Sequence, residues 1–238
     1  MKKIVASLFL VVLIIAVTAC SNSKNIDGDT KTVSNGSSSN DAKSSLAIKD
    51  SGWSFYQSDF GNEFSYGFEL YNKDKNYLAG FPKVKIVGRD DNNKILFSYD
   101  ATLDYIYPGE TLYYGDTTSI ETERPAKVEF TVSVAKSDWE NSKTVSYPKN
   151  TDFPISNISE FKDDSDLKYT GEIENKSNTD IHAAAIVVIF KKDNKIVGGA
   201  NSFSDKLDSK QKDAFEMYVL NPPEYDSYEF SSHVSMIN

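Results

Sequence analysis

Apolar and polar residues alternate with a period of two along much of this chain. The alternation is clearest at residues 64–70, 84–88 and 128–134, where aromatic or aliphatic side chains are separated mostly by polar ones. In an extended strand this spacing places the apolar groups on one face and the polar groups on the other. No run of ten residues carries an apolar stripe at the 3.6-residue period of a helix. The pattern therefore predicts an all-β fold built from antiparallel strands.

The densest apolar run covers residues 183–190, with the sequence Ala-Ala-Ala-Ile-Val-Val-Ile-Phe. Its three alanines are also compatible with a helix. The β-branched second half and the polar turn segments on both sides favour a strand instead. We expect this run to be a central strand of a β-sandwich.

One pattern occurs twice between residues 53 and 238, at a spacing close to 100 residues. The matched segments, in chain order, are 66–73 with 169–176, 84–96 with 187–197, 108–114 with 209–215, and 127–132 with 227–232. The second pair reads as two strands around a turn rich in Asp and Asn, which is a hairpin signal. Four matched elements in the same order predict two tandem antiparallel sandwiches, each with six or seven short strands.

Composition and charge narrow the range of functions. The chain has 14 Tyr and 14 Phe but only 3 Met, and aromatic residues favour half-buried sheet surfaces. Its formal net charge is −9. A surface of that sign repels phosphate backbones and anionic lipid headgroups, which argues against a nucleic-acid partner and against a polybasic membrane contact.

The N-terminus resembles a bacterial lipoprotein signal peptide. Lys2 and Lys3 precede an apolar run, residues 4–17, that is too short for a comfortable membrane span and ends in small residues. Val17-Thr18-Ala19-Cys20 resembles the lipobox. The resemblance implies cleavage before Cys20, the only cysteine, and diacylglyceryl transfer to its thiol. It places the protein on the cell membrane, lipid-anchored and facing the extracytoplasmic side. The alternative is an uncleaved anchor helix with an incidental cysteine.

The remaining chain divides by composition. Residues 21–50 are rich in Ser, Asn, Asp and Lys and contain no aromatic residue, so they bury too little apolar surface to fold alone. Prolines stiffen the join between the repeats. We expect five segments: a signal peptide at 1–19, the lipidated cysteine with a flexible tether at 20–50, a first β-sandwich at 51–140, a linker at 141–156, and a second β-sandwich at 157–238.

The segment Phe68-Glu69-Leu70-Tyr71-Asn72 resembles the motif of FxLYD-type modules, which are related to immunoglobulin-like domains of bacterial surface lipoproteins. The matching segment of the second repeat, residues 171–175, departs from the motif at both aromatic positions. The resemblance implies an immunoglobulin-like sandwich and an outer location. It brings no catalytic residues with it.

Candidate chemistry is sparse. The chain has two histidines, His182 and His233, and neither lies in a nucleophile elbow or at a zinc-ligand spacing. We expect His182 at a strand end and His233 to be exposed. The acidic runs at 90–93 and 163–166 are interpreted as turns in preference to calcium sites. We therefore expect no enzyme activity, no cofactor and no metal.

The remaining signal is aromatic. Tyr105, Tyr107, Tyr113 and Tyr114 cluster in the first repeat, and exposed tyrosines stack on sugars or anchor protein interfaces. By strand alternation, Tyr105 and Tyr107 point the same way, whereas Tyr113 and Tyr114 point to opposite faces. These four residues are candidate binding residues. The alternative is that the rings fill the sandwich core.

The leading hypothesis is a non-enzymatic surface lipoprotein whose sandwiches bind a protein or a cell-envelope polymer. A passive structural spacer is the first alternative. An accessory solute-binding lipoprotein or an envelope hydrolase comes last, because solute receptors usually need a larger α/β chain with a cleft.

Overall fold

A computed structural model describes residues 45–58, 61–163 and 166–236, all within one compact unit, Ser38–Asn238. The predicted signal peptide, the predicted lipidation site Cys20 and residues 21–44 of the predicted tether lie outside these ranges. Within them the fold is all-β, and every strand pair is antiparallel. The tandem β-sandwich prediction is confirmed.

The first repeat contains nine strands in three small sheets. The strands are β1 (Leu46–Ser58), β2 (Gly61–Asn72), β3 (Tyr77–Gly80), β4 (Lys83–Arg89), β5 (Ile95–Thr102), β6 (Tyr105–Ile106), β7 (Thr111–Ile120), β8 (Lys127–Ser133) and β9 (Trp139–Asn141). The sheet orders are β1-β2-β7, β5-β4-β8 and β6-β3-β9. A short 3₁₀ turn, η1 (Lys136–Asp138), precedes β9.

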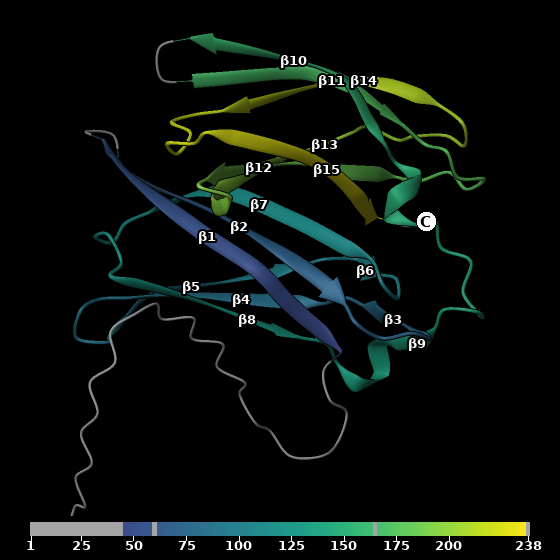
Figure 1. Ribbon diagram of the computed structural model, residues 1–238, viewed down its shortest axis with the longest axis horizontal. Helices are drawn as coiled ribbons and strands as arrows, with labels where there is room; N and C mark the ends of the chain where they lie inside the picture. The colour runs from purple at the N-terminus through teal and green to yellow at the C-terminus, as the bar shows by residue number, and fades with distance from the viewer. Residues whose placement is uncertain (1–44, 59–60, 164–165, 237–238) are drawn as a thin grey trace, which may run out of the picture. The chain divides into compact units, whose positions relative to one another are not determined.

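The second repeat is simpler. Its strands are β10 (Ile155–Asp163), β11 (Asp166–Glu174), β12 (Ala183–Lys192), β13 (Lys195–Phe203), β14 (Lys212–Val219) and β15 (Ser227–Met236). They form the sheets β10-β11-β14 and β13-β12-β15, preceded by a 3₁₀ turn, η2 (Asn150–Asp152). The sheets stack in the order β5-β4-β8, β1-β2-β7, β13-β12-β15, β10-β11-β14 (Figure 1).

The period-two pattern accounts for the two cores. In β2, the apolar set points into the first sandwich and is buried against β4, whereas β11 directs its apolar set into the second sandwich. The buried residues are Phe64, Tyr66, Phe68 and Leu70 of β2, Val84 and Ile86 of β4, and Leu167, Tyr169 and Ile173 of β11. Burial of such side chains is the main stabilising term for each sandwich.

Strand β12 is buried on both faces, as expected for a central strand. Its even-numbered residues, from Ala184 to Phe190, belong to the core of the second sandwich. Its odd-numbered residues Ala185, Val187 and Ile189 pack with Ile196 against Tyr113 of the first repeat. The continuous apolar run at 183–190 therefore has a physical reason: this strand has no solvent-facing side, because the two repeats pack against each other.

The recurring Asn of the repeat has the same task in both copies. The Asn72 side chain donates hydrogen bonds to the carbonyls of Tyr77 and Ile106, at 2.9 and 3.0 Å. Asn175, at an offset of 103, donates to Thr179 and Leu207 at 2.9 and 3.1 Å. Both asparagines are fully buried. Each ties the end of one strand to two loops, so this motif position is structural.

Two predictions about position need correction. The predicted tether extends to residue 50, but β1 begins at Leu46, which pairs with Asn72 and is buried in the first core. Leu46 and Ile48 are two residues apart, so both point into that core. His233 was expected to be exposed, but it is buried because β15 pairs with the central strand β12, opposite Ala185.

Other local expectations are confirmed. His182 is exposed just before β12. The 90–93 segment is a hairpin turn in which Asp90 Oδ1 accepts hydrogen bonds from the amides of Asn92 and Lys94, and Asn93 has a φ of 65°. These contacts are the ones Asp and Asn make in turns. The other acidic run includes residues 164–165, which lie outside the described ranges.

Candidate functional site

The four candidate tyrosines do not form one exposed surface. Tyr105 and Tyr107 are buried, and their hydroxyls donate to the linker carbonyls of Pro148 and Tyr147, at 2.5 and 2.8 Å. The prediction that these two rings are available for binding is therefore wrong. The reason is that the segment joining the repeats folds back over β6, and both rings anchor it.

Tyr113 and Tyr114 point to opposite faces of β7, as the alternation predicts, and both are half-buried. Tyr114 stacks on Phe68 in the first core, with ring centroids 5.2 Å apart, and burial raises the pKa of its hydroxyl to about 12. Tyr113 faces the second repeat, where Lys191 Nζ lies 5.5 Å from the ring centroid. The alternative interpretation of these rings, as packing groups, describes their surroundings better.

Strand β13 of the second repeat crosses the outer face of the β1-β2-β7 sheet at very short range. A Cβ added at Gly115 of β7 would lie 2.7 Å from the Gly199 Cα of β13. One added at Gly52 of β1 would lie 1.6 Å from the carbonyl oxygen of Ile196. Only glycine permits this approach of backbone to backbone. The two repeats are therefore fitted together through their main chains.

Side chains of the first repeat also satisfy backbone groups on the edge of β13. Ser65 Oγ donates to the Gly199 carbonyl and accepts from the Gly199 amide, at 3.0 and 3.1 Å. Thr117 Oγ1 donates to the same carbonyl at 3.1 Å. Asn201 of β13 returns a hydrogen bond to the Gly115 carbonyl at 2.7 Å. The backbone groups of Gly199 on the edge of β13 are therefore hydrogen-bonded by side chains of the first repeat and are not left for pairing with another strand.

The linker region adds a bridge between the repeats. Asn150 Nδ2 donates to Glu110 Oε2 at 3.2 Å, and Asn150 Oδ1 accepts from the Val234 amide of β15 at 3.2 Å. Burial raises the pKa of the Glu110 carboxyl, against hydrogen bonds from Tyr107 and Asn150 that lower it. A small cavity of about 220 Å³ lies beside these groups, lined in part by Tyr107 and Lys149.

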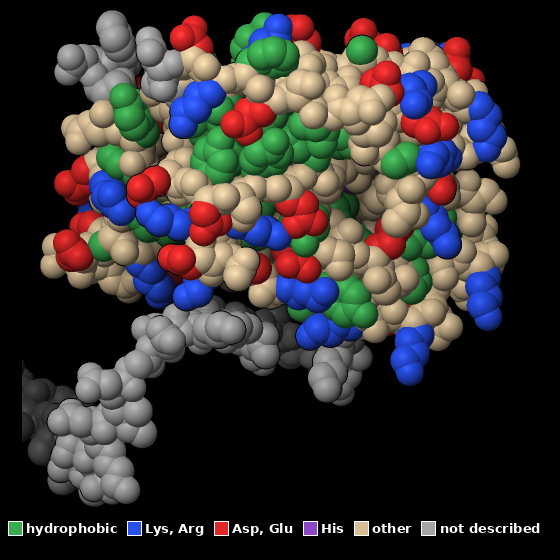
Figure 2. All heavy atoms as spheres, turned by 45° about the horizontal axis from the view of Figure 1, so that its top comes forward, with side chains coloured by type: hydrophobic (Ala, Val, Ile, Leu, Met, Phe, Trp, Pro, Cys, Tyr) green, Lys and Arg blue, Asp and Glu red, His purple; other side chains and the backbone are tan. Residues whose placement is uncertain are grey.

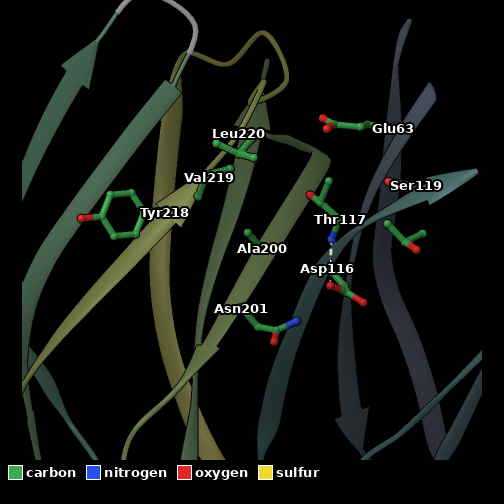
Figure 3. A pocket seen from close by; sticks show the side chains of 10 residues that line it. Glu63, Asp116, Thr117, Ser119, Ala200, Asn201, Tyr218, Val219 and Leu220 are labelled. Atoms are coloured by element: carbon green, nitrogen blue, oxygen red, sulfur yellow. Dashed lines mark hydrogen bonds between the residues drawn. The ribbon is translucent and has the colours of Figure 1, made fainter. Parts of the chain in front are cut away.

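A larger groove, of about 290 Å³, opens between the repeats. Four strands contribute to its lining: β2, β7, β13 and β14. The lining residues are Glu63, Asp116, Thr117, Thr118, Ser119, Ala200, Asn201, Tyr218, Val219 and Leu220. Figure 3 shows Glu63, Thr117 and Asp116 on one side of it and Tyr218, Val219 and Leu220 on the other. We call this feature the inter-repeat groove.

The groove carries negative charge. Among the residues that the structure describes, its lining contains the carboxylates of Glu63 and Asp116 and no Lys or Arg side chain. Glu63 Oε2 accepts a hydrogen bond from Asn221 Nδ2 at 3.1 Å, and Asp116 Oδ1 accepts from the Thr117 amide at 2.9 Å. Burial raises the pKa of Asp116, and hydrogen bonds from Thr117 and Tyr66 act in the opposite direction. A positively charged group placed here would find two carboxylates without a cationic lining neighbour.

One wall of the groove is apolar and exposed. Tyr218 and Leu220 are 64% and 55% exposed, although both are large apolar side chains. Lys168 Nζ lies 5.2 Å from the Tyr218 ring centroid, on the outer face of the β10-β11-β14 sheet. Exposed aromatic and aliphatic side chains beside a hollow are common features of binding surfaces.

The groove is also bordered by the edges of two sheets, since β7 and β14 each have one hydrogen-bonded neighbour strand. In an antiparallel pair, every second residue directs both its backbone groups away from the partner. The Glu216 carbonyl of β14 points outward, because it receives Ser202 Oγ at 3.5 Å. Tyr218, two residues further on, belongs to the same outward set.

Sequence reasoning did not single out Glu63, Asp116, Tyr218 or Leu220. They lie far apart in the chain, and the two repeats bring them together only by packing. The available signal was the outer face of β2 and β7, where small residues such as Ser65, Gly67 and Gly115 replace the usual charged ones. That composition is typical of a face that receives another element closely.

In the described ranges, no group of three or more His, Cys, Asp or Glu side chains is arranged to hold a metal ion. The same part of the chain contains no helix of the length and apolarity needed to cross a membrane. In comparisons with known proteins, no family model matches the chain and no curated protein is significantly similar to it.

Proposed function

We propose that this protein is a membrane-anchored, extracytoplasmic lipoprotein that serves as a non-enzymatic interaction module for a protein or a cell-envelope polymer. The lipobox-like segment ending in Cys20 supports the anchor. The observation that carries the interaction role is the inter-repeat groove, an acidic hollow with an exposed apolar wall. Its two sides come from repeats that contact through main-chain groups, so the groove is preorganised for a partner.

A non-enzymatic role agrees with the surroundings of the histidines. His233 is buried in β15, and His182 is exposed just before β12. The proposal assigns partner contact to other residues than the four tyrosines named by the sequence-based hypothesis. Tyr105 and Tyr107 are buried and have a structural role. In this proposal the partner contacts the exposed Tyr218 and Leu220 on the groove wall.

The spacer alternative has its own support. Figure 2 shows Lys, Arg, Asp and Glu side chains interspersed over the visible face. Many of them pair across neighbouring strands, as Lys168 does with Glu216 at 2.8 Å and Lys191 with Glu229 at 2.6 Å. A mixed-charge surface keeps a protein soluble without selecting a partner.

The anchor is tested by labelling cells that express the full chain with an alkyne-tagged palmitate. We expect label and membrane association in the natural protein and in a Ser21→Ala control. Cys20→Ala should abolish the label and leave the leader uncleaved, because the chain has no other thiol to take the lipid. If the natural protein stays in the membrane fraction without label, the uncleaved anchor helix is favoured and the lipoprotein proposal is contradicted.

The interaction role is tested in the same cells with a photo-crosslinking amino acid placed at Tyr218 on the groove wall. The matched control places it at Tyr77, which is also exposed, at 45%, but does not line the groove. We expect one discrete crosslinked product when the crosslinker is at position 218 and no such product when it is at position 77. Equal, diffuse products from both positions would favour the spacer.

A further inference from the structure

The inter-repeat groove has the form of a site for an added strand. One wall consists of Tyr218 and Val219 at the end of β14 and the following Leu220, and the other of residues 116–119 of β7. At about 3.3 Å per residue, these walls match an extended segment of about four residues. Tyr218 lies in the set whose backbone groups point away from β11, towards the groove. An extended chain is therefore offered backbone donors and acceptors as well as a hollow.

The side chains around this edge set the pattern that such a segment would need. Tyr218 lies directly opposite Lys168 in β11, which in turn lies opposite Phe161 in β10. This row lies on the outer face of its sheet, with Phe161 and Tyr218 both exposed. In a strand added next to β14, every second side chain would extend this row beside Tyr218. An apolar side chain suits those positions.

The intervening side chains of an added strand would point to the other face of the sheet, beside Val219, which also lines the groove. There they would meet the carboxylates of Glu63 and Asp116. The described lining residues include no Lys or Arg and the chain has a net charge of −9, so the complementary side chains are basic. A strand added at this edge would therefore fit best with alternating apolar and basic residues.

We propose that the inter-repeat groove binds an extended segment of a partner protein with alternating apolar and basic residues, which pairs as an added strand with the edge of β14. This inference rests on the proposed function, because it names the partner chemistry for the same groove. The partner is a polypeptide, since a carbohydrate polymer would not use the outward backbone groups of β14 in register. The hydrogen bonds from the first repeat reach β13 at Gly199, and Ser202 of β13 reaches β14 at the Glu216 carbonyl, so the added strand would pair with β14 at Tyr218.

The test uses the full chain in detergent and a fluorescein-labelled hexapeptide of alternating Val and Lys, followed by fluorescence anisotropy. We expect saturable binding of this probe and none of a Val-Glu hexapeptide. The same Val-Lys peptide with N-methyl groups on alternate amides keeps its charge but loses donors for strand pairing. Its binding should weaken at least about tenfold, the loss expected when about 1.4 kcal/mol of hydrogen bonding is removed.

Two variant pairs separate the groove from general attraction between charges. Glu63→Gln with Asp116→Asn should weaken binding of the Val-Lys probe at least about fivefold. The matched control, Asp91→Asn with Glu123→Gln, removes two exposed carboxylates elsewhere and should leave the affinity within about twofold. Tyr218→Pro removes a backbone donor from the edge strand and should weaken binding more than Tyr218→Val, which keeps it. Thermal unfolding of each variant verifies that it folds.

Three results would overturn the proposal: no binding of the Val-Lys probe, equal weakening by both pairs of carboxylate variants, or unchanged affinity of the N-methylated peptide. The last would mean that the groove takes cationic groups without strand pairing. Crosslinking from position 218 in cells without peptide binding would contradict strand addition and leave the interaction role standing. Peptide binding without any crosslinked product in cells would contradict the proposed function instead.

Discussion

At the scale of single residues, the two repeats are defined by buried polar groups as much as by apolar ones. The fully buried Asn72 and Asn175 side chains each donate hydrogen bonds to two carbonyls. Ser65 serves both backbone groups of Gly199. Such groups specify one arrangement, because any other leaves a buried donor or acceptor unpaired. The positions of the two asparagines account for the Asn that recurs between the repeats.

Asn175→Ala should lower the free energy of unfolding by about 2–4 kcal/mol. It leaves the carbonyls of Thr179 and Leu207 without this donor, and it removes the oxygen that accepts hydrogen bonds from the Ser177 amide and hydroxyl. Urea denaturation followed by tryptophan fluorescence measures the change. Asn178→Ala, at an exposed position nearby, is the control and should stay within about 0.5 kcal/mol of the natural protein. Equal effects of both substitutions would contradict the structural role of Asn175.

His233 should make the fold sensitive to acid. Burial lowers the pKa of its imidazole to about 4, below the ordinary value of 6.5. The unfolded chain therefore binds a proton first, and stability is lost as pH falls from about 6.5 to about 4, by on the order of 3 kcal/mol. Denaturation curves of the natural protein and of His233→Leu, measured across this range, should diverge by that amount.

The control for this comparison is His182→Leu, because His182 is exposed. Its curves should follow those of the natural protein at every pH. Burial also raises the pKa of Asp104 to about 6 and that of Asp116, and such shifts act in the opposite sense. The difference between the two histidine variants removes these contributions. A pH dependence unchanged by His233→Leu would show that the imidazole does not titrate abnormally.

At the scale of elements, alternation in the sequence was sufficient to predict most strands and their buried faces. The predictions at 64–70, 84–88 and 128–134 correspond to β2, β4 and β8, and the run at 183–190 to β12. Strands β3, β6 and β9 have only two to four residues, too few for a period to be visible. The run at 183–190 is apolar at every position, so both faces of the strand are apolar. This pattern indicates a strand that is covered on both sides.

The groove could not be predicted in this way. Its residues follow from how one face of β1-β2-β7 meets β13, and that contact depends on where glycines allow main chains to approach. The exposure of Tyr218 also has no signature in its own strand, where it occupies an ordinary outward position opposite Lys168. The groove forms only when the two repeats pack together, so the residue pattern along a single strand does not predict it.

Gly115→Ala tests the contact between elements. Its new Cβ would lie 2.7 Å from the Gly199 Cα, so β7 and β13 must separate. We expect a loss of about 1–3 kcal/mol of stability, the usual cost of overpacking, measured by chemical denaturation. Ser119→Ala, at an exposed position of the same strand, should have little effect. A neutral outcome for Gly115→Ala would mean that the repeats are not in close contact there.

At the scale of the whole described unit, the repeats act together. The core of the second sandwich includes Leu78, Tyr105 and Tyr107 of the first repeat, and Asn150 of the linker contacts both. The sequence predicted two sandwiches joined by an extended linker. The structure adds that they share buried surface, so the groove between them has walls with a fixed separation. A preformed groove loses little entropy when a partner binds.

The most direct test of whether the inter-repeat groove recognises a basic partner is photo-crosslinking from position 218 in cells. The yield of product is compared between two charge variants of the full chain. With the control pair Asp91→Asn and Glu123→Gln, we expect the same discrete product as in the natural background. With Glu63→Gln and Asp116→Asn, that product should fall at least about fivefold, because the groove has lost its carboxylates. A product of equal yield in both backgrounds would contradict the claim that the inter-repeat groove recognises a basic partner.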